Sequence, residues 1–334
     1  MKLKENYRNI LFQLERDSRK SLTEIGRSIE KSQQTTSYAV NNMEERDQIK
    51  GYYPLFDYTK FGYNGYLLLF RINNFSREKI DDLVKMFLEN EMVAWVQMLD
   101  GVWDILLFFL APNPSYFNKE FKSVVSEYPE QLSTYEILTS VVIHDMERAY
   151  LSEESSMGTR DIIIGGDRNV FSLKDEERET CRVINENPRK ATVSMAEELG
   201  VTSKTVMDRR KSLEERKLIK GYRPLLGIRE LDLFVTIVLI SYKEEEVEKE
   251  NEVVDYCRAH ENVALLMKTF GSWDMMIRLE TESREGKRKV VRSLRENFGK
   301  VISDYNSLEV MEDLKKSYLP DGFFKPDAFQ PVEE

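Results

Sequence analysis

The sequence has 334 residues, of which 41% are hydrophobic and 32% are charged, and its formal net charge is −10. This length favours two or more domains, and no apolar run approaches the roughly 20 residues that a membrane helix needs. The N-terminus is charged and lacks the apolar core of a signal peptide, and two cysteines, Cys181 and Cys257, are too few for a disulfide framework or a four-cysteine zinc site. We therefore expect a cytoplasmic protein with no cofactor and no metal site.

The chain contains a long internal repeat with an offset of 170 residues. EERDQIKGYYPL at 44–55 returns as EERKLIKGYRPL at 214–225, with nine of twelve residues identical. DGVWDI at 100–105 is matched by FGSWDM at 270–275. A chance match would not keep register from about residue 19 to about residue 140, so the pattern predicts a tandem duplication.

Each repeat begins with three short stretches of helical apolar spacing. Ser32 and Thr202 are suitable N-caps for the third helix, and Gly200 suits a tight turn before it. The predicted inward-facing residues are Tyr7, Ile10, Leu11, Leu14, Leu22, Ile25, Ile29, Thr36, Val40 and Met43 in the first repeat, and Cys181, Ile184, Met195, Leu199, Val206 and Leu213 in the second. Three such helices with a tight turn before the third are typical of a helix-turn-helix.

The repeated IKGYxPL motif follows the third helix. Gly51 supplies a turn, and Pro54 excludes helix, so residues 52–55 are predicted to run out as an extended wing. Each repeat therefore begins with a winged helix-turn-helix.

The remainder of each repeat alternates between strand and helix patterns in the order βαββαβ. In the first repeat the strands are expected at 66–72, 93–98, 104–110 and 132–144 and the helices at 77–89 and 116–128, and residues 234–312 repeat the pattern. This order predicts a ferredoxin-like sheet with two helices on one face. The bare face needs a cover, so the two sheets are expected to face each other in an internal pseudo-dimer.

These elements predict six segments. They are a winged helix-turn-helix at 1–60, a ferredoxin-like domain at 61–151, a linker at 152–172, a second winged helix-turn-helix at 173–229, a second ferredoxin-like domain at 230–320, and a tail at 321–334. The linker is rich in Ser, Gly and charge, although its IIIGG core is also compatible with a short strand.

Two motifs, each present twice and in the same order, resemble those of the Lrp/AsnC (feast/famine) family of transcription regulators. VTSKTVMDRRKSLEERKLIKGYRPLL at 201–226 resembles the family's recognition helix, and GVWDILLFFL and GSWDMMIRLE resemble the Gly-x-x-Asp hairpin of its ligand-sensing domain. The resemblance covers nearly the whole chain twice. It implies an α+β fold, with two tandem copies of a winged helix-turn-helix followed by a ferredoxin-like βαββαβ ligand-sensing domain, and a sequence-specific regulator that binds double-stranded DNA.

The sequence departs from the family pattern in three ways. The family arginine is present as Arg209, but Ala39 stands at that position in the first repeat, and Arg210 stands where an apolar residue is expected. Family members usually carry one unit per chain and dimerise, whereas this chain carries both units. Whether it forms a further homo-oligomer stays open.

The charge distribution agrees with DNA binding at the helix-turn-helix segments. Residues 1–60 carry a net charge of +2 and residues 173–229 carry +4, so the rest of the chain carries −16. Phosphate contacts require Lys and Arg, so positive charge is concentrated where DNA would dock. Acidic sensing domains would be kept away from the duplex.

The two third helices differ in their polar side chains. Residues 202–217 hold six basic residues, whereas 32–47 hold only Arg46 and instead offer amides, which pair with adenine. Phosphate contacts in the first repeat are expected from Lys2, Lys4, Arg19, Lys20 and Arg27. The candidate DNA-binding residues are Gln33, Gln34, Ser37, Tyr38, Asn41, Ser203, Lys204, Asp208, Arg209 and Lys211. The alternative is that these side chains form a solvated helix face.

The two Gly-x-x-Asp hairpins are candidate effector sites. In the resembled family small effectors such as amino acids bind near this hairpin, which implies Gly101, Asp104, Gly271 and Asp274. The alternative is structural: the glycines serve the turn and the aspartates cap it.

Enzymatic chemistry finds little support in the sequence. His144 and His260 are the only histidines, and neither a Gly-rich phosphate loop nor a His-Glu-x-x-His motif is present. We therefore expect a protein that is not an enzyme. Two alternatives stay open: a sirohaem decarboxylase-like enzyme, whose subunits share this fold, and a sensing or scaffold protein without DNA binding.

Overall fold

The computed structural model describes residues 4–73, 77–152, 161–167, 169–243 and 248–325. Its first half contains α1 (Glu5–Arg16), α2 (Leu22–Ser28), α3 (Gln33–Glu45), β1 (Ile49–Phe56), β2 (Asn64–Arg71), α4 (Arg77–Glu89), β3 (Val93–Asp100), β4 (Ile105–Ala111), α5 (Pro114–Glu127) and β5 (Thr134–Met146). After β6 (Asp161–Gly165), the second half contains α6 (Asp175–Glu186), α7 (Thr192–Leu199), α8 (Ser203–Glu215), β7 (Ile219–Leu226), β8 (Phe234–Tyr242), α9 (Glu250–Ala259), β9 (Val263–Phe270), β10 (Met275–Thr281), α10 (Arg284–Phe298) and β11 (Ile302–Lys316). The predicted α+β class and element order are confirmed.

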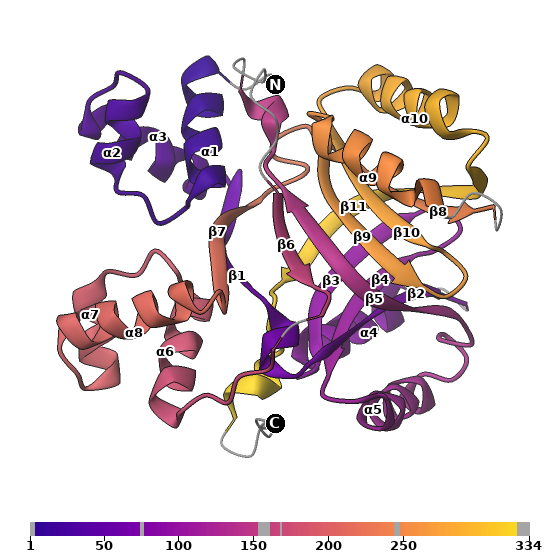
Figure 1. The fold of residues 1–334 in the computed structure, drawn as a ribbon, viewed down its shortest axis with the longest axis horizontal. Helices are drawn as coiled ribbons and strands as arrows, with labels where there is room; N and C mark the ends of the chain where they lie inside the picture. The colour runs from indigo at the N-terminus through magenta and orange to yellow at the C-terminus, as the bar shows by residue number, and fades with distance from the viewer. Residues whose placement is uncertain (1–3, 74–76, 153–160, 168, 244–247, 326–334) are drawn as a thin grey trace.

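Both helix-turn-helix units form for local reasons. Ser21 begins α2 with a capping box, and the side chains of Ser32 and Thr202 accept hydrogen bonds from the backbone of the first turn of α3 and α8. The inward-facing residues of the first unit pack into a cluster that includes Ile10, Leu14, Ile25, Val40 and Met43. Figure 1 shows the two units on the same side of the molecule, above and below one another.

The segments expected as wings pair with each other instead of standing free. β1 and β7 form a two-stranded antiparallel ribbon in which Tyr52 lies opposite Pro224 and Pro54 opposite Tyr222. Tyr53 lies opposite Arg223, its own counterpart in the repeat, so a pseudo-two-fold axis passes between them. The predicted extended segments are therefore confirmed as strands, and the backbone that each would otherwise leave unpaired is satisfied by the other copy.

The strands of the two ferredoxin-like units form one closed ring. The order is β2-β4-β3-β11-β8-β10-β9-β5, and β5 pairs again with β2. The long strands β5 and β11 make the junctions: each pairs first with a strand of its own half and then with a strand of the other half, β9 and β3 respectively. The two sheets that were expected to face each other are thus also joined at their edges.

The ring has a core inside it and one outside each half. The inner cluster takes residues from both halves, among them Leu67, Phe108, Ile237 and Met276. α4 and α5 cover the outer face of the first half, and α9 and α10 cover that of the second (Figure 1). Among the described residues, no helix has both the length and the apolar character that crossing a bilayer requires.

The segment between the halves is partly built into the ring. β6 pairs with β5, with Val142 opposite Gly165, so the IIIGG core does form a strand. Residues 153–160 and 168 of the expected linker, and 326–334 of the expected tail, lie outside the described residues. The start of that tail is ordered, since Phe323 is buried against Phe61 and Tyr63 of the first half.

Candidate nucleic-acid interface

α3 presents an exposed polar face with one aromatic residue. Gln33, Gln34 and Asn41 are exposed, Ser37 is half-buried, and Tyr38 is 69% exposed. The opposite face is buried through Thr36, Ala39, Val40 and Met43. The helix is held close to α2 because Gly26 has no side chain: a Cβ there would lie 2.9 Å from the Thr36 hydroxyl oxygen.

α8 presents the matching face in the second half. Lys204, Asp208 and Lys211 are exposed, and Ser203 and Arg209 are half-buried. Each set of predicted DNA-binding residues therefore lies on a single helix. The helical spacing in the sequence already predicts this placement.

Most of the positive charge of α8 is paired with carboxylates. The guanidinium of Arg209 lies 4.0 Å from the Glu176 carboxylate and donates to the Glu176 carbonyl, and Arg210 and Lys211 lie 3.4 and 3.6 Å from Glu214 and Glu215. Arg216 pairs with Glu177 at 2.6 Å. In the described part of the chain, Lys204 and Lys217 have no carboxylate within ion-pair distance. Lys204 is therefore the exposed α8 charge that is most available to a phosphate.

Arg19 has another role than the phosphate contact expected for it. Its guanidinium donates to the carbonyl of Pro188 and lies 5.6 Å from the ring of Tyr222. Arg189, its counterpart in the repeat, donates to the carbonyl of Ser18. These reciprocal bonds tie the two helix-turn-helix units together, so the expectation for Arg19 is wrong. Lys20 donates to Gln13, whereas Lys4 and Arg27 are exposed, and Lys2 lies outside the described residues.

A buried ionic cluster connects α1 to the ring. Arg148 donates to Glu15 at 2.8 Å and to Glu280 at 2.7 Å, and Arg223 lies 3.2 Å from Asp145. Burial alone would lower the pKa of Arg148, but Glu15 and Glu280 raise it well above its usual value. Burial would raise the pKa of Glu280, but Arg148 and Arg278 lower it. Sequence reasoning missed this cluster, because its members are far apart in the chain and follow no spacing pattern.

The two Gly-x-x-Asp hairpins are built alike. The carboxylate of Asp104 accepts from the backbone of Ile72, and that of Asp274 accepts from Tyr242, both at 2.7 Å. Gly101 and Gly271 have φ values of 148° and 150°, and a Cβ at Gly271 would lie 2.7 Å from Leu138 on β5. These contacts show a structural role for both residue types: closing the hairpin and fitting it against the last strand of the other half.

The two histidines lie apart from each other. His144 on β5 is hydrogen-bonded to Asp161 on β6 at 2.8 Å, and Arg258 also contacts that carboxylate. Burial would raise the pKa of Asp161, but these two partners lower it. Nothing in the described ranges groups three or more metal-ligating side chains.

Comparisons with known proteins match the first helix-turn-helix unit by sequence and nearly the whole chain by fold. Residues 3–50 match the sequence model of a family described as winged helix-turn-helix DNA-binding. A search of curated proteins with the sequence gives no match. The crystal structure of the siroheme decarboxylase NirDL is similar with a TM-score of 0.59 and 12% identity, over 94% of both chains. The structure of NirDL in complex with an iron-uroporphyrin III analogue has the same TM-score, over 96% of this chain and 95% of its own.

Solved AsnC-type regulators match a smaller part. An AsnC family transcriptional regulator from Agrobacterium tumefaciens is 19% identical, with a TM-score of 0.38, over 43% of this chain and 94% of its own. The whole-chain similarity to NirDL overturns the expectation that this protein is not an enzyme, because an enzyme has the same fold along its full length.

Proposed function

We propose that this chain is a sequence-specific DNA-binding transcriptional regulator of the Lrp/AsnC type, in a tandem form that carries both DNA-binding units of a dimer. The observation that carries the proposal is the pair of capped helices α3 and α8, which expose polar faces from two units on one side of the molecule (Figure 1). The match of residues 3–50 to a DNA-binding family model supports the first unit.

The two helices differ in the contacts they offer. α3 offers amide groups, which form bidentate hydrogen bonds with adenine, and α8 offers Lys204 and Lys211 to phosphates and Ser203, Asp208 and Arg209 to base edges. The reciprocal bonds of Arg19 and Arg189 support a fixed distance between the units. An operator with two unlike half-sites, an imperfect palindrome, follows from this difference.

Selection of bound fragments from a genomic duplex library tests the proposal. The full chain is expected to enrich a site with two half-sites, and Gln34→Ala with Asn41→Ala is expected to relax the sequence of one of them. A matched control, Lys79→Ala, is on α4, which covers the outer face of the first half, and this variant should enrich the same site. If the full chain binds no genomic fragment more tightly than a random-sequence duplex at low salt, the result would instead favour a sensing or scaffold protein without DNA binding.

A small effector such as an amino acid is a further part of the proposal. Both hairpins carry a carboxylate, Asp104 and Asp274, and a glycine that lets the backbone approach its neighbours closely. Thermal unfolding in the presence of each amino acid tests this, since a ligand that binds only the folded state raises Tm. No change in Tm or in DNA affinity with any of them would remove the effector from the proposal.

Decarboxylation of a sirohaem-like tetrapyrrole is a second candidate function. It is favoured by the fold similarity to NirDL along nearly the whole chain, including a structure in complex with an iron-uroporphyrin III analogue. Titration of the purified protein with iron-uroporphyrin III tests it, because a bound haem-type ligand shifts its absorbance band. A shift together with loss of carboxylate from sirohaem would establish the enzyme, and an unchanged spectrum would exclude this ligand.

A further inference from the structure

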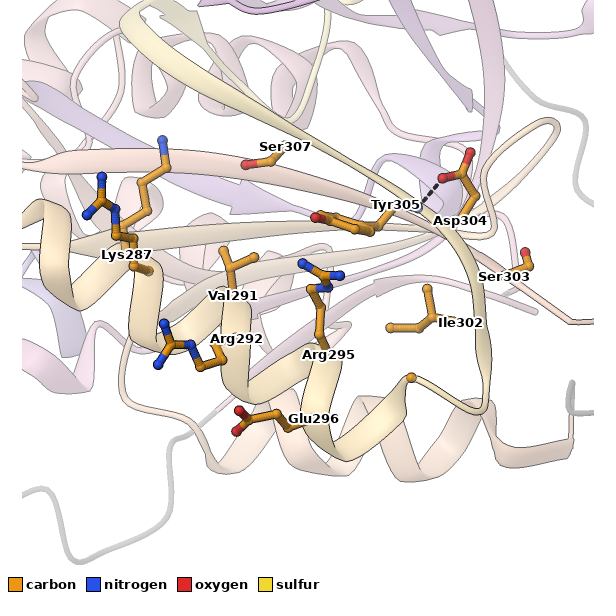
Figure 2. Close-up of a pocket in the computed structure, with 12 residues that line it drawn as sticks. Lys287, Val291, Arg292, Arg295, Glu296, Ile302, Ser303, Asp304, Tyr305 and Ser307 are labelled. Atoms are coloured by element: carbon orange, nitrogen blue, oxygen red, sulfur yellow. Dashed lines mark hydrogen bonds between the residues drawn. The ribbon is translucent and has the colours of Figure 1, made fainter.

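A basic groove lies between α10 and the first part of β11. It has a volume of about 870 Å³ and is lined by Lys287, Arg288, Arg292 and Arg295 of the helix and by residues 302–305 and 307 of the strand. Figure 2 shows Val291 and Arg295 pointing from α10 toward Tyr305 of β11. The guanidinium of Arg295 lies 4.8 Å from the centre of the Tyr305 ring. The groove therefore combines several cations with an aromatic and aliphatic floor.

Three of these cations have no carboxylate partner within the described ranges. Lys287 pairs with Glu309 at 3.1 Å, but no carboxylate lies within ion-pair distance of Arg288, Arg292 or Arg295. This differs from α8, where most arginines are paired. Cations left unpaired in a chain of net charge −10 indicate an anion that comes from outside the chain.

The equivalent position in the first half, between α5 and β5, is filled by packed side chains. There Phe117 stacks on Tyr66 with ring centres 3.9 Å apart, and Phe121 contacts the edge of Tyr135 at 4.9 Å. At the offset of 170, Phe117, Phe121 and Val125 become Lys287, Val291 and Arg295, and Ile137 becomes Ser307. The aromatic packing of one half is thus replaced by an open, charged groove in the other.

The fold of α10 does not depend on the arginines. The helix is anchored by Val290, Leu294 and Phe298, which are buried in the outer core of the second half. Its cations lie on the exposed side, and α10 lies on the opposite side of the molecule from α3 and α8 (Figure 1). DNA held by the helix-turn-helix units would not cover this groove.

We propose that the groove binds a small amphipathic polyanion of the nucleoside polyphosphate class. Arg288, Arg292 and Arg295 stand on successive turns, so their guanidinium groups can each take a phosphate in bidentate geometry. Val291, Ile302 and Tyr305 provide an apolar surface for the base. The volume falls in the range of roughly 300–1,000 Å³ that is usual for small-ligand sites.

The acidic residues around the groove limit the length of the ligand. Glu296 and Asp304 line the groove near the C-terminal end of α10. These carboxylates would repel a nucleic-acid strand that continued past that end of the helix. A short phosphate chain avoids them, so the charge pattern favours a nucleotide over an RNA or DNA backbone.

Calorimetric titration of the full chain with ATP, without divalent metal and at low salt, tests the proposal. ATP is expected to bind once per chain, and Arg292→Gln with Arg295→Gln to weaken binding at least tenfold. The matched control is Lys122→Gln on α5, the counterpart of Arg292, which should leave the affinity unchanged. Adenosine alone should not bind detectably, and tripolyphosphate should bind more weakly than ATP.

Several results would overturn the proposal. They are no heat of binding with ATP, equal affinities for the wild type and the double variant, or equal binding of adenosine and ATP. Tripolyphosphate that binds as tightly as ATP would show that the apolar floor is unused. If the double variant instead loses affinity for a random DNA duplex and the wild type ignores ATP, the groove belongs to a nucleic-acid surface. Circular dichroism of the variants checks that α10 is intact.

Discussion

Arg148 illustrates how much one buried residue connects. It lies just after β5, is 6% exposed, and bonds to Glu15 of α1 and Glu280 of β10. Its counterpart in the repeat is Tyr318, whose hydroxyl donates to Asp145 at 2.7 Å. At this pair of equivalent positions, an ionic contact in the first half therefore corresponds to a hydroxyl–carboxylate hydrogen bond in the second.

The first prediction concerns the removal of this guanidinium. Arg148→Met removes a cationic partner from two buried carboxylates, Glu15 and Glu280, so we expect the free energy of unfolding to fall by about 3–5 kcal/mol. Urea denaturation measures it. The control is Arg182→Met, which breaks three partly exposed ion pairs, two within α6 and one with Glu198 of α7, and should cost less than about 1 kcal/mol. An equal loss of unfolding free energy in both variants would show that burial does not determine how much an ion pair contributes to stability.

The second prediction concerns acid. Burial alone would raise the pKa values of Glu280 and Asp313, but Arg148 and Arg278 lower the pKa of Glu280, and Arg278 lowers that of Asp313. Since the folded-state pKa values lie below the unfolded ones, of about 4, the stability they contribute is present above pH 4 and is lost as the pH falls toward the folded values. Unfolding free energies measured between pH 6 and pH 2 should stay nearly constant above about pH 5 and fall below it. Glu280→Gln should flatten that slope, and the exposed Glu285→Gln should not.

At the scale of elements, the turns before α3 and α8 each contain a residue in the left-handed conformation. Gly200 has φ 63°, and its counterpart Glu30 has φ 56°. Sequence reasoning identified the glycine but not the glutamate, because a glutamate gives no local signal for positive φ. The turn geometry is set by the packing of the flanking helices in both units.

The third prediction uses this pair. A Cβ at Gly200 would meet no atom within 4 Å, so Gly200→Ala is disfavoured only by its backbone conformation, by roughly 1 kcal/mol. Glu30→Gly relieves the strain of a side chain at positive φ but raises the conformational entropy of the unfolded chain, so the two effects oppose each other. The net change in stability should be less than half of that for Gly200→Ala. Thermal unfolding of both variants measures the difference. A larger loss for Glu30→Gly would contradict it.

The fourth prediction concerns the two recognition helices. Lys204→Ala with Lys211→Ala should reduce the salt dependence of DNA binding, by about 0.9 in slope for each lost phosphate contact. Gln34→Ala with Asn41→Ala should leave the slope unchanged and reduce discrimination between sites by roughly 1–3 kcal/mol per lost base pairing. Binding isotherms at several salt concentrations separate the two. If both double variants lower the slope equally, the helices do not divide the contacts as proposed.

At the scale of the whole molecule, the fixed arrangement of the two units is the main feature. The ribbon of β1 and β7 and the reciprocal bonds of Arg19 and Arg189 hold them together on one side of a closed ring. A bound DNA would then have a set distance between its half-sites.

The fifth prediction tests this rigidity. Arg19→Ala with Arg189→Ala should leave each recognition helix intact but loosen the units, so binding should tolerate half-site spacings that the wild type rejects. Competition between operators with one or two added base pairs measures it. The control is Arg27→Ala on α2, an exposed residue that should weaken binding at every spacing alike. An unchanged spacing preference in the double variant would show that the ribbon alone sets the distance.

The sequence by itself determined the elements whose signals are local. Helical spacing, the caps Ser32 and Thr202, and the Gly-x-x-Asp turns predicted the helix-turn-helix units and the βαββαβ order, and the offset of 170 predicted two similar halves. These features depend on residues within one or two turns of one another, so their chemistry is visible in the linear order.

Only the tertiary structure decided which copy each strand joins and which charges stay free. A repeat does not tell whether β5 pairs within its own half or with β9 of the other, because both edges offer the same backbone hydrogen bonds. Likewise Arg19 and Arg292 look alike in the sequence, yet one is bonded across the repeat and the other lines an open groove. Pairing and burial depend on residues distant in the chain, and these come together only when the ring closes.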